Sequence, residues 1–243
     1  MVHKILNLME ENNVEPDNLT LNTKLRLHVA ECFSITETEK LLAECDTNIG
    51  FKLDWRTSCE IAKAYLNEGL VLKAVGMLSR AEESVDPKSK KLAYESLLML
   101  YGNAGKAEDV YRIWDMYKNL PDKNSEGYRL VISFSLKLGD IVTADKIRKE
   151  WVKGYNKFDV RIVSMMASAY CERGLTTNAK GLMRSMMIQK YISDMPIRHF
   201  LLLLLVCYHL SCDLYILLDF VSKMVLAIVT KEDYEELEQL IDF

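Results

Sequence analysis

Glycines recur along the middle of the chain at an almost constant spacing, and this feature constrains the fold more than any other. They are 36, 34 and 35 residues apart, at Gly69, Gly105, Gly139 and Gly174. The prolines repeat the same unit with separations of 71, 34 and 75 residues, at Pro16, Pro87, Pro121 and Pro196. Because glycine readily ends a helix and proline breaks one, a period in the mid-thirties predicts stacked helical hairpins. Only 10 glycines and 4 prolines occur in 243 residues, too few for a turn-rich all-β protein.

Five columns keep their character when the chain is aligned on these glycines. Eight and seven residues before the glycine stand apolar side chains: Ile61, Leu97, Val131 and Met166, then Ala62, Leu98, Ile132 and Ala167. Four residues before it stand Tyr65, Tyr101, Ser135 and Tyr170. Five and eight residues after it stand slim and then larger apolar side chains: Ala74, Val110, Ala144 and Ala179, then Met77, Ile113, Ile147 and Leu182. Spacings of three and four predict two helices that pack their apolar faces together.

An earlier and more degenerate unit covers residues 18–54, with Ser34 about where the glycine should stand. The segment before it, KILNLMEENNVEPD, predicts a lone second helix of a hairpin. Half a hairpin leaves an apolar face uncovered. We therefore expect the chain to be a fragment, or to begin at an internal methionine of a longer protein.

Three segments resemble pentatricopeptide repeats: YESLLMLYGNAGKAEDVYRIWDMYKN, YRLVISFSLKLGDIVTADKIRKEWVKG and VRIVSMMASAYCERGLTTNAKGLMRSM. Tetratricopeptide repeats share the period, but they require a small residue seven positions after the slim column, which is twelve positions after the periodic glycine. Here that position holds Ala81, Tyr117, Trp151 and Met186. The Ile113-Trp114 and Glu150-Trp151 pairs are similar to those of the plant organellar P-class, and the resemblance covers about residues 4–190. It implies an all-α, right-handed α-solenoid of about five helix-turn-helix repeats, spanning residues 1–190 with an incomplete first hairpin.

The resemblance also implies single-stranded RNA as the partner, typically with one base read per repeat. The fifth position of the first helix and the last position of the repeat would contact the base edge. Carried over by position, these pairs are Asn22 with Asp54, Cys59 with Lys90, Glu95 with Asn124, and Arg129 with Asp159, while Ser164 opens a fifth pair. Only Asn22 with Asp54 matches a combination that the family associates with a particular base, uracil.

The second position of the first helix should hold an apolar side chain that wedges between bases. It holds Leu19, Arg56, Leu92, Glu126 and Arg161. The leucines fit this role, the arginines could stack by their guanidinium planes, and Glu126 would repel phosphate. The alternative is a diverged solenoid in which these side chains are simply solvated.

Charge is unevenly placed along the chain. The net charge is −4 over residues 1–124, +6 over residues 125–190 and −6 over residues 191–243. A basic block is what phosphate contacts require, so Arg129 and Arg161 are the leading candidates for such contacts. An ordinary solvated face would show the same count.

Residues 191–243 depart from the repeat pattern as an apolar segment with an acidic tail. The apolar part, Ile197 to Thr230, is interrupted by Asp213, Asp219 and Lys223, whereas a membrane span needs about 20 predominantly apolar residues. We expect a helical cap on the array. A membrane-active segment and a gene-model artefact are the alternatives.

Catalytic and metal-binding patterns find no support. Cys207, His209 and Cys212 do not share one helical face, and there is no Gly-rich phosphate loop, HExxH or nucleophile elbow. We therefore expect no enzyme activity, cofactor or metal, and six reduced, mostly buried cysteines in an intracellular compartment.

The leading function is RNA binding in organellar RNA processing, stability or translation. By resemblance the compartment is the mitochondrion, with the chloroplast as alternative. The rival function is a scaffold that binds other proteins.

Overall fold

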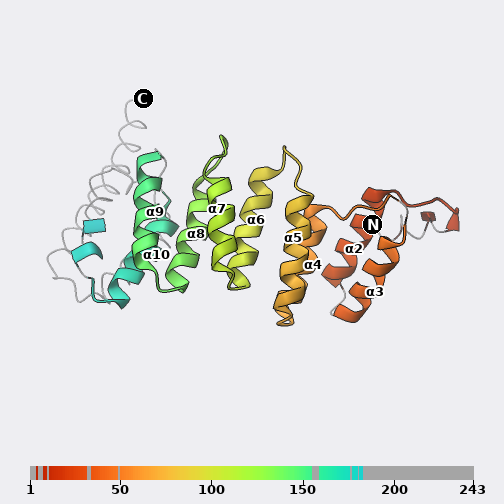
Figure 1. The fold of residues 1–243 in the computed structure, drawn as a ribbon, viewed down its shortest axis with the longest axis horizontal. Helices are drawn as coiled ribbons and strands as arrows, with labels where there is room; N and C mark the ends of the chain where they lie inside the picture. Colours follow the sequence, from red (N-terminus) through yellow and green to blue (C-terminus); the bar gives the residue numbers. More distant parts are fainter. Residues whose placement is uncertain are drawn as a thin grey trace, which may run out of the picture. The chain divides into compact units, whose positions relative to one another are not determined.

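The protein is described by a computed structural model that covers residues 11–31, 34–48, 50–154, 159–175, 177–179 and 181–182, together with residues 4, 8 and 9. Within these residues all regular structure is helical (Figure 1). The helices are α2 (Asn18–Glu31), α3 (Ile35–Asp46), α4 (Trp55–Asn67), α5 (Val71–Glu83), α6 (Lys90–Asn103), α7 (Ala107–Tyr117), α8 (Ser125–Lys137), α9 (Ile141–Gly154) and α10 (Val160–Glu172). They fall into two compact units, residues 1–131 and 132–243, whose boundary lies inside α8.

The first unit is a stack of helical hairpins, as the period predicts. Helices α2 and α3, α4 and α5, and α6 and α7 pair as hairpins. The first helices of successive hairpins also pack on one another, α2 on α4 and α4 on α6. This row of first helices is the framework on which the expected base-reading positions stand. In the second unit, α9 packs against α10.

The periodic glycines end the first helix of each hairpin in the left-handed conformation. Gly69, Gly105, Gly139 and Gly174 have φ angles of 73°, 69°, 82° and 68°. The residue after each glycine donates its N–H to the carbonyl five residues earlier, as Leu70 does to Tyr65 at 2.8 Å. These bonds satisfy carbonyls that the helix end leaves free, so the predicted capping role is confirmed. In the degenerate unit Ser34 has φ −100° and instead caps α3 by accepting from the Glu37 N–H at 3.4 Å.

The predicted apolar columns form the core. The four columns at eight and seven residues before the glycine and five and eight after it are all buried, with no member more than 7% exposed. Full burial of one such side chain contributes about 1.5–3 kcal/mol, so these columns supply much of the packing free energy. The slim column is fully buried at Ala74, Val110, Ala144 and Ala179, which fits the predicted close approach of two helices.

Several expectations concern segments that the structure describes only in part or not at all. Of the lone helix expected over residues 4–17, residues 4, 8, 9 and 11 are helical, residues 5–7 and 10 lie outside the described residues, and residues 12–17 are not helical, so the helix ends earlier than expected. The expected cap, its membrane-active alternative and the boundary at residue 190 lie outside them too. Among the described residues, no helix has the length and apolar character needed to cross a membrane. Cys45, Cys59 and Cys171 are free thiols.

Candidate nucleic-acid interface

The first expected pair, Asn22 with Asp54, is brought together at the start of α4. Asn22 is 1% exposed, and its Oδ1 accepts the Asp54 N–H at 2.9 Å. The Asn22 Nδ2 donates to the Lys52 and Asn18 carbonyls, both at 2.9 Å. Asp54 is the N-cap of α4, where its Oδ1 accepts the Thr57 N–H at 2.7 Å. The polar atoms of this pair therefore hold the loop that enters α4.

The second pair, Cys59 with Lys90, joins a buried side chain to an exposed one. Cys59 is 6% exposed, and burial raises the pKa of its thiol to about 12. A neutral buried thiol is a weak hydrogen-bond donor and acceptor. Lys90 is the exposed first residue of α6. At this repeat the lysine, and not the thiol, offers a strong polar group at the surface.

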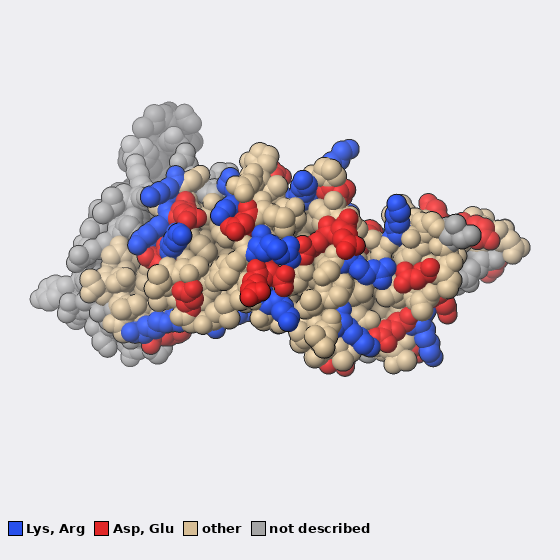
Figure 2. Space-filling model, viewed as in Figure 1, with Lys and Arg blue, Asp and Glu red and all other residues tan. Residues whose placement is uncertain are grey.

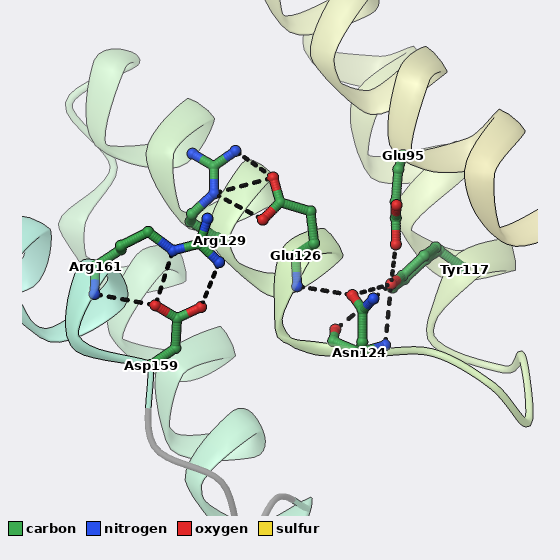
Figure 3. Close-up of polar contacts among 7 residues, drawn as sticks. All are labelled: Glu95, Tyr117, Asn124, Glu126, Arg129, Asp159 and Arg161. Carbon is green, nitrogen blue, oxygen red and sulfur yellow. Dashed lines mark hydrogen bonds and ion pairs between the residues drawn. The ribbon is translucent and has the colours of Figure 1, made fainter. Parts of the chain in front are cut away.

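The third pair, Glu95 with Asn124, meets at the hydroxyl of Tyr117, the last residue of α7 (Figure 3). The Tyr117 Oη lies 2.9 Å from Glu95 Oε1 and 3.1 Å from Asn124 Oδ1, and it accepts the Asn124 N–H at 3.1 Å. Asn124 Oδ1 also accepts the Glu126 N–H at 2.8 Å. Burial raises the pKa of Glu95, and the hydrogen bond from Tyr117 opposes that shift only in part.

The two arginines expected to contact phosphate each bind a neighbouring carboxylate (Figure 3). In the first unit, Arg129 forms an ion pair with Glu126, three residues earlier on α8, and its Nε is 3.1 Å from both carboxylate oxygens. In the second unit, Arg161 Nη2 lies 2.7 Å from Asp159 Oδ2 at the start of α10. Glu126, expected to repel phosphate, thus offsets the charge of Arg129. Near Arg161, Ser164 is 6% exposed, and its buried Oγ has no hydrogen-bond partner within the part of the chain that the structure describes.

The wedge positions on α2, α4 and α6 lie open to solvent, whereas Glu126 on α8 is half-buried. Leu19 and Leu92 are 67% and 53% exposed, near the starts of α2 and α6. Between these helices α4 carries Arg56, which is exposed and whose guanidinium carbon lies 4.9 Å from the centre of the Trp55 ring. Such a guanidinium plane can stack on a ring or a base. Equivalent positions of this row therefore hold two exposed leucines and one arginine that stacks on a tryptophan.

Charge on the surface is mixed in sign. In Figure 2 acidic and basic side chains alternate over the visible face, without a continuous basic stripe. In the second unit, Asp145 accepts ion pairs from Arg148 and Lys149, both at 2.8 Å. The basic block counted along the sequence is thus partly neutralised by local pairing. No group of three His, Cys, Asp or Glu side chains that could hold a metal occurs among the described residues.

Reasoning from the sequence missed the role of Tyr117. Its column had signalled only that large residues are tolerated there: Ala81, Tyr117, Trp151 and Met186. A usable signal was present, because tyrosine is the one member of that column with a hydroxyl. It also missed that the Asn22 amide forms hydrogen bonds with backbone groups. These bonds depend on the course of the loop before α4.

Comparison with known proteins agrees with the resemblance seen in the repeats. No protein-family model matches the chain. A mitochondrial pentatricopeptide repeat-containing protein of Arabidopsis thaliana is 41% identical over 192 residues, which are 79% of this chain and 39% of that protein. A protein of Arabidopsis thaliana named as a putative pentatricopeptide repeat-containing protein is 43% identical over 197 residues, 81% of this chain and 35% of that protein. The chain thus spans little more than a third of these relatives.

A further relative and a solved structure extend the comparison. The large ribosomal subunit protein mL101 of Arabidopsis thaliana is 34% identical over 130 residues, 53% of this chain and 26% of that protein. The crystal structure of the pentatricopeptide repeat protein PPR10 from maize matches with a TM-score of 0.52 at 18% identity, covering 77% of this chain and 26% of that one. The expected all-α solenoid class is confirmed by this likeness of fold. The two Arabidopsis relatives above 40% identity show that the chain belongs to the plant pentatricopeptide repeat family.

Proposed function

We propose that this chain binds single-stranded RNA along the row of first helices α2, α4 and α6. The observation that carries the proposal is the exposure of Leu19 and Leu92, at 67% and 53%, on either side of the exposed Arg56. A fold that buries its other repeating apolar columns has no packing use for these leucines. Apolar side chains can wedge between bases, and a guanidinium can stack on one. Unstacked bases are accessible in single-stranded RNA, and a repeat array presents such side chains at a regular rise.

Two relatives support a proposal about the biological role. One relative carries a mitochondrial designation in its name, and another is a large ribosomal subunit protein. We propose that the chain acts in the mitochondrion, in the processing, stability or translation of transcripts, and without catalysis of its own.

A protein-interaction scaffold is the second candidate function, and one observation favours it. Arg129 and Arg161, the leading phosphate contacts, are each paired with a carboxylate two or three residues away. Exposed leucines and arginines paired with carboxylates would suit a protein-binding solenoid as well. The two functions differ in salt dependence, because phosphate contacts release counterions whereas apolar contacts do not.

Filter binding of labelled single-stranded RNA, repeated over a range of salt concentrations, tests the proposal. We expect saturable binding at low salt that weakens when Leu19 and Leu92 are both changed to alanine. Leu72→Ala is the matched control, because Leu72 is 84% exposed but lies on α5, the second helix of its hairpin. Equal losses for the control and the double variant would show that the row is not the binding surface. Absence of saturable binding at low salt would favour the scaffold.

The same assay measures the contribution of the two arginines. Each phosphate neutralised on a single strand contributes about 0.7 to the slope of log affinity against log salt. Changing Arg129 and Arg161 to glutamate should therefore flatten the slope by about 1.4 if each meets one phosphate. Reversing Lys4 and Lys24 is the control for diffuse charge. Equal effects of the two pairs would refute the assignment to the arginines.

A further inference from the structure

The Tyr117 hydroxyl occupies the point where the third base-reading pair would meet a nucleotide. It lies 2.9 Å from Glu95 Oε1 and 3.1 Å from Asn124 Oδ1, and it accepts the Asn124 N–H (Figure 3). A base edge is read by groups that have hydrogen-bonding capacity to spare. Here the carboxylate has an internal donor, and the amide oxygen also accepts from the backbone of α8. Recognition of a base would have to displace these bonds.

Displacing the hydroxyl is unfavourable because Tyr117 is 0% exposed. A nucleotide that took its place on Glu95 would remove the bond of this buried hydroxyl to the carboxylate and leave it with Asn124 as its partner. The loss of a buried hydrogen bond to a charged group is comparable to the gain from the new hydrogen bond. The hydrogen-bonding groups of Glu95 and Asn124 are thus occupied by a hydroxyl that cannot turn to solvent.

The placement of Tyr117 is built into the neighbouring helix. A Cβ on Gly127 would lie 2.5 Å from Tyr117 Cζ and 2.7 Å from Cδ1, so the ring uses the space that the glycine leaves. The equivalent position, twelve residues before the periodic glycine, holds Thr57, Ala93, Gly127 and Ile162. The one glycine in that column therefore faces the one tyrosine of the other column. This coincidence indicates a specific arrangement of the two residues.

We propose that Tyr117 is a specificity-determining residue that silences base reading at the repeat formed by α6 and α7. The inference rests on the proposed RNA-binding function. The exposed Leu92 of the same repeat can still wedge beside a base, and such contacts are tolerant of sequence. This repeat then holds its nucleotide without choosing among the four bases.

The test is a competition assay on the full chain with single-stranded RNA oligonucleotides that differ at one position at a time. Wild type should show no base preference that depends on Glu95 or Asn124. Tyr117→Phe keeps the ring against Gly127 but removes the hydroxyl, and it should create a new preference at one position. We expect about tenfold between the best and worst base, which corresponds to about 1.4 kcal/mol.

Two further variants make the result decisive. Tyr101→Phe is the matched control, because its buried hydroxyl donates to Glu82 on α5 at 2.6 Å, and it should leave the profile flat. Glu95→Gln should also leave it flat, since Tyr117 can still donate to the amide oxygen. This second variant decides the matter if Tyr117→Phe does not fold.

The outcomes separate the inference from the function on which it rests. An unchanged profile for a folded Tyr117→Phe that still binds RNA would overturn the inference alone. So would a wild-type preference that Glu95→Gln alters. Failure of wild type to bind any of the oligonucleotides would overturn the proposed function, and the inference with it.

Discussion

Gly127→Ala should destabilise the protein, although glycine to alanine inside a helix is usually favourable. The built Cβ would lie 2.5 and 2.7 Å from two carbons of the Tyr117 ring, and closer still to Cε1. Carbon atoms normally approach to about 3.5–4.0 Å, so the ring must move by about 1 Å or more. Tyr117 is fully buried, so its ring cannot simply move into solvent.

The size of the effect follows from two opposing contributions. Overpacking of a well-packed core costs about 1–3 kcal/mol, and the displaced hydroxyl loses hydrogen bonds worth about 0.5–1.5 kcal/mol each. Replacing glycine by alanine in a helix gains at most about 1 kcal/mol. We expect a net loss of about 2 kcal/mol in the free energy of unfolding.

Urea unfolding followed by circular dichroism, with hydrogen exchange on α7 and α8, would measure this loss where it occurs. Gly76→Ala is the matched control, because a Cβ on this exposed residue of α5 would meet nothing within 4 Å. It should be neutral or stabilising by up to about 1 kcal/mol. In a Tyr117→Leu background the penalty of Gly127→Ala should largely disappear. A Gly127→Ala protein as stable as Gly76→Ala, or a penalty unchanged by Tyr117→Leu, would refute the reasoning.

Three further predictions, the first with a control substitution, test other contacts. Ala144→Trp should cost about 1–3 kcal/mol, because Ala144 is fully buried. Val142→Trp, at a position 78% exposed, should change stability by less than about 0.5 kcal/mol in the same urea titration. Burial raises the pKa of Glu95, so the folded state holds that proton more tightly than the unfolded state. Its contribution is greatest below the unfolded pKa and is lost as pH rises through the folded one. Glu95→Gln should therefore stabilise at pH 7, and a gain that did not shrink toward pH 4 would contradict this. At Asp145, burial favours the neutral acid, but hydrogen bonds from Lys149, Tyr170 and Arg148 outweigh it and lower the pKa. Asp145→Asn should destabilise at pH 7, and the difference should fade as pH falls through the folded pKa, which stability curves at several pH values would show.

The hairpins could be predicted from the sequence because their determinants are local and repeat. A glycine such as Gly105 must stop a helix wherever it needs a positive φ, and its neighbours at helical spacing must then be buried. Four aligned units repeat that logic, so chance agreement at one position does not mislead. The glycine-capped ends of the first helices and the buried columns followed directly from it.

The candidate site could be predicted by position but not by chemistry. Asn22 stands at a base-reading position, yet both ends of its amide are bonded within the protein. Arg129 lies in the basic block, yet Glu126 neutralises it one helical turn away. Net charge over a segment counts residues and ignores which of them face each other. Such pairings depend on the rotamers and loop paths of the folded chain, and these are not periodic.

The column four residues before the periodic glycine holds Tyr65, Tyr101, Ser135 and Tyr170, and it serves both packing and hydrogen bonding between helices. Each tyrosine of this column donates to a carboxylate of the preceding second helix: Tyr65 to Glu39 at 3.1 Å, Tyr101 to Glu82 at 2.6 Å and Tyr170 to Asp145 at 2.6 Å. Burial, and then the carboxylate, raises the pKa of Tyr65 and of Tyr170 to about 12, so the hydroxyl stays a donor.

In the first unit, a basic side chain on the second helix of the following hairpin also pairs with each of these carboxylates. Lys73 Nζ lies 2.6 Å from Glu39, and Arg112 Nη1 lies 2.6 Å from Glu82. One carboxylate thus connects three successive helices, through a buried hydroxyl on one side and a surface ion pair on the other. Because exposed ion pairs contribute little and a hydrogen bond to a charged group contributes about 1.5–3 kcal/mol, the tyrosine is the stronger part of each link. The spacing that ends the helices therefore also places the polar bonds that hold one hairpin to the next.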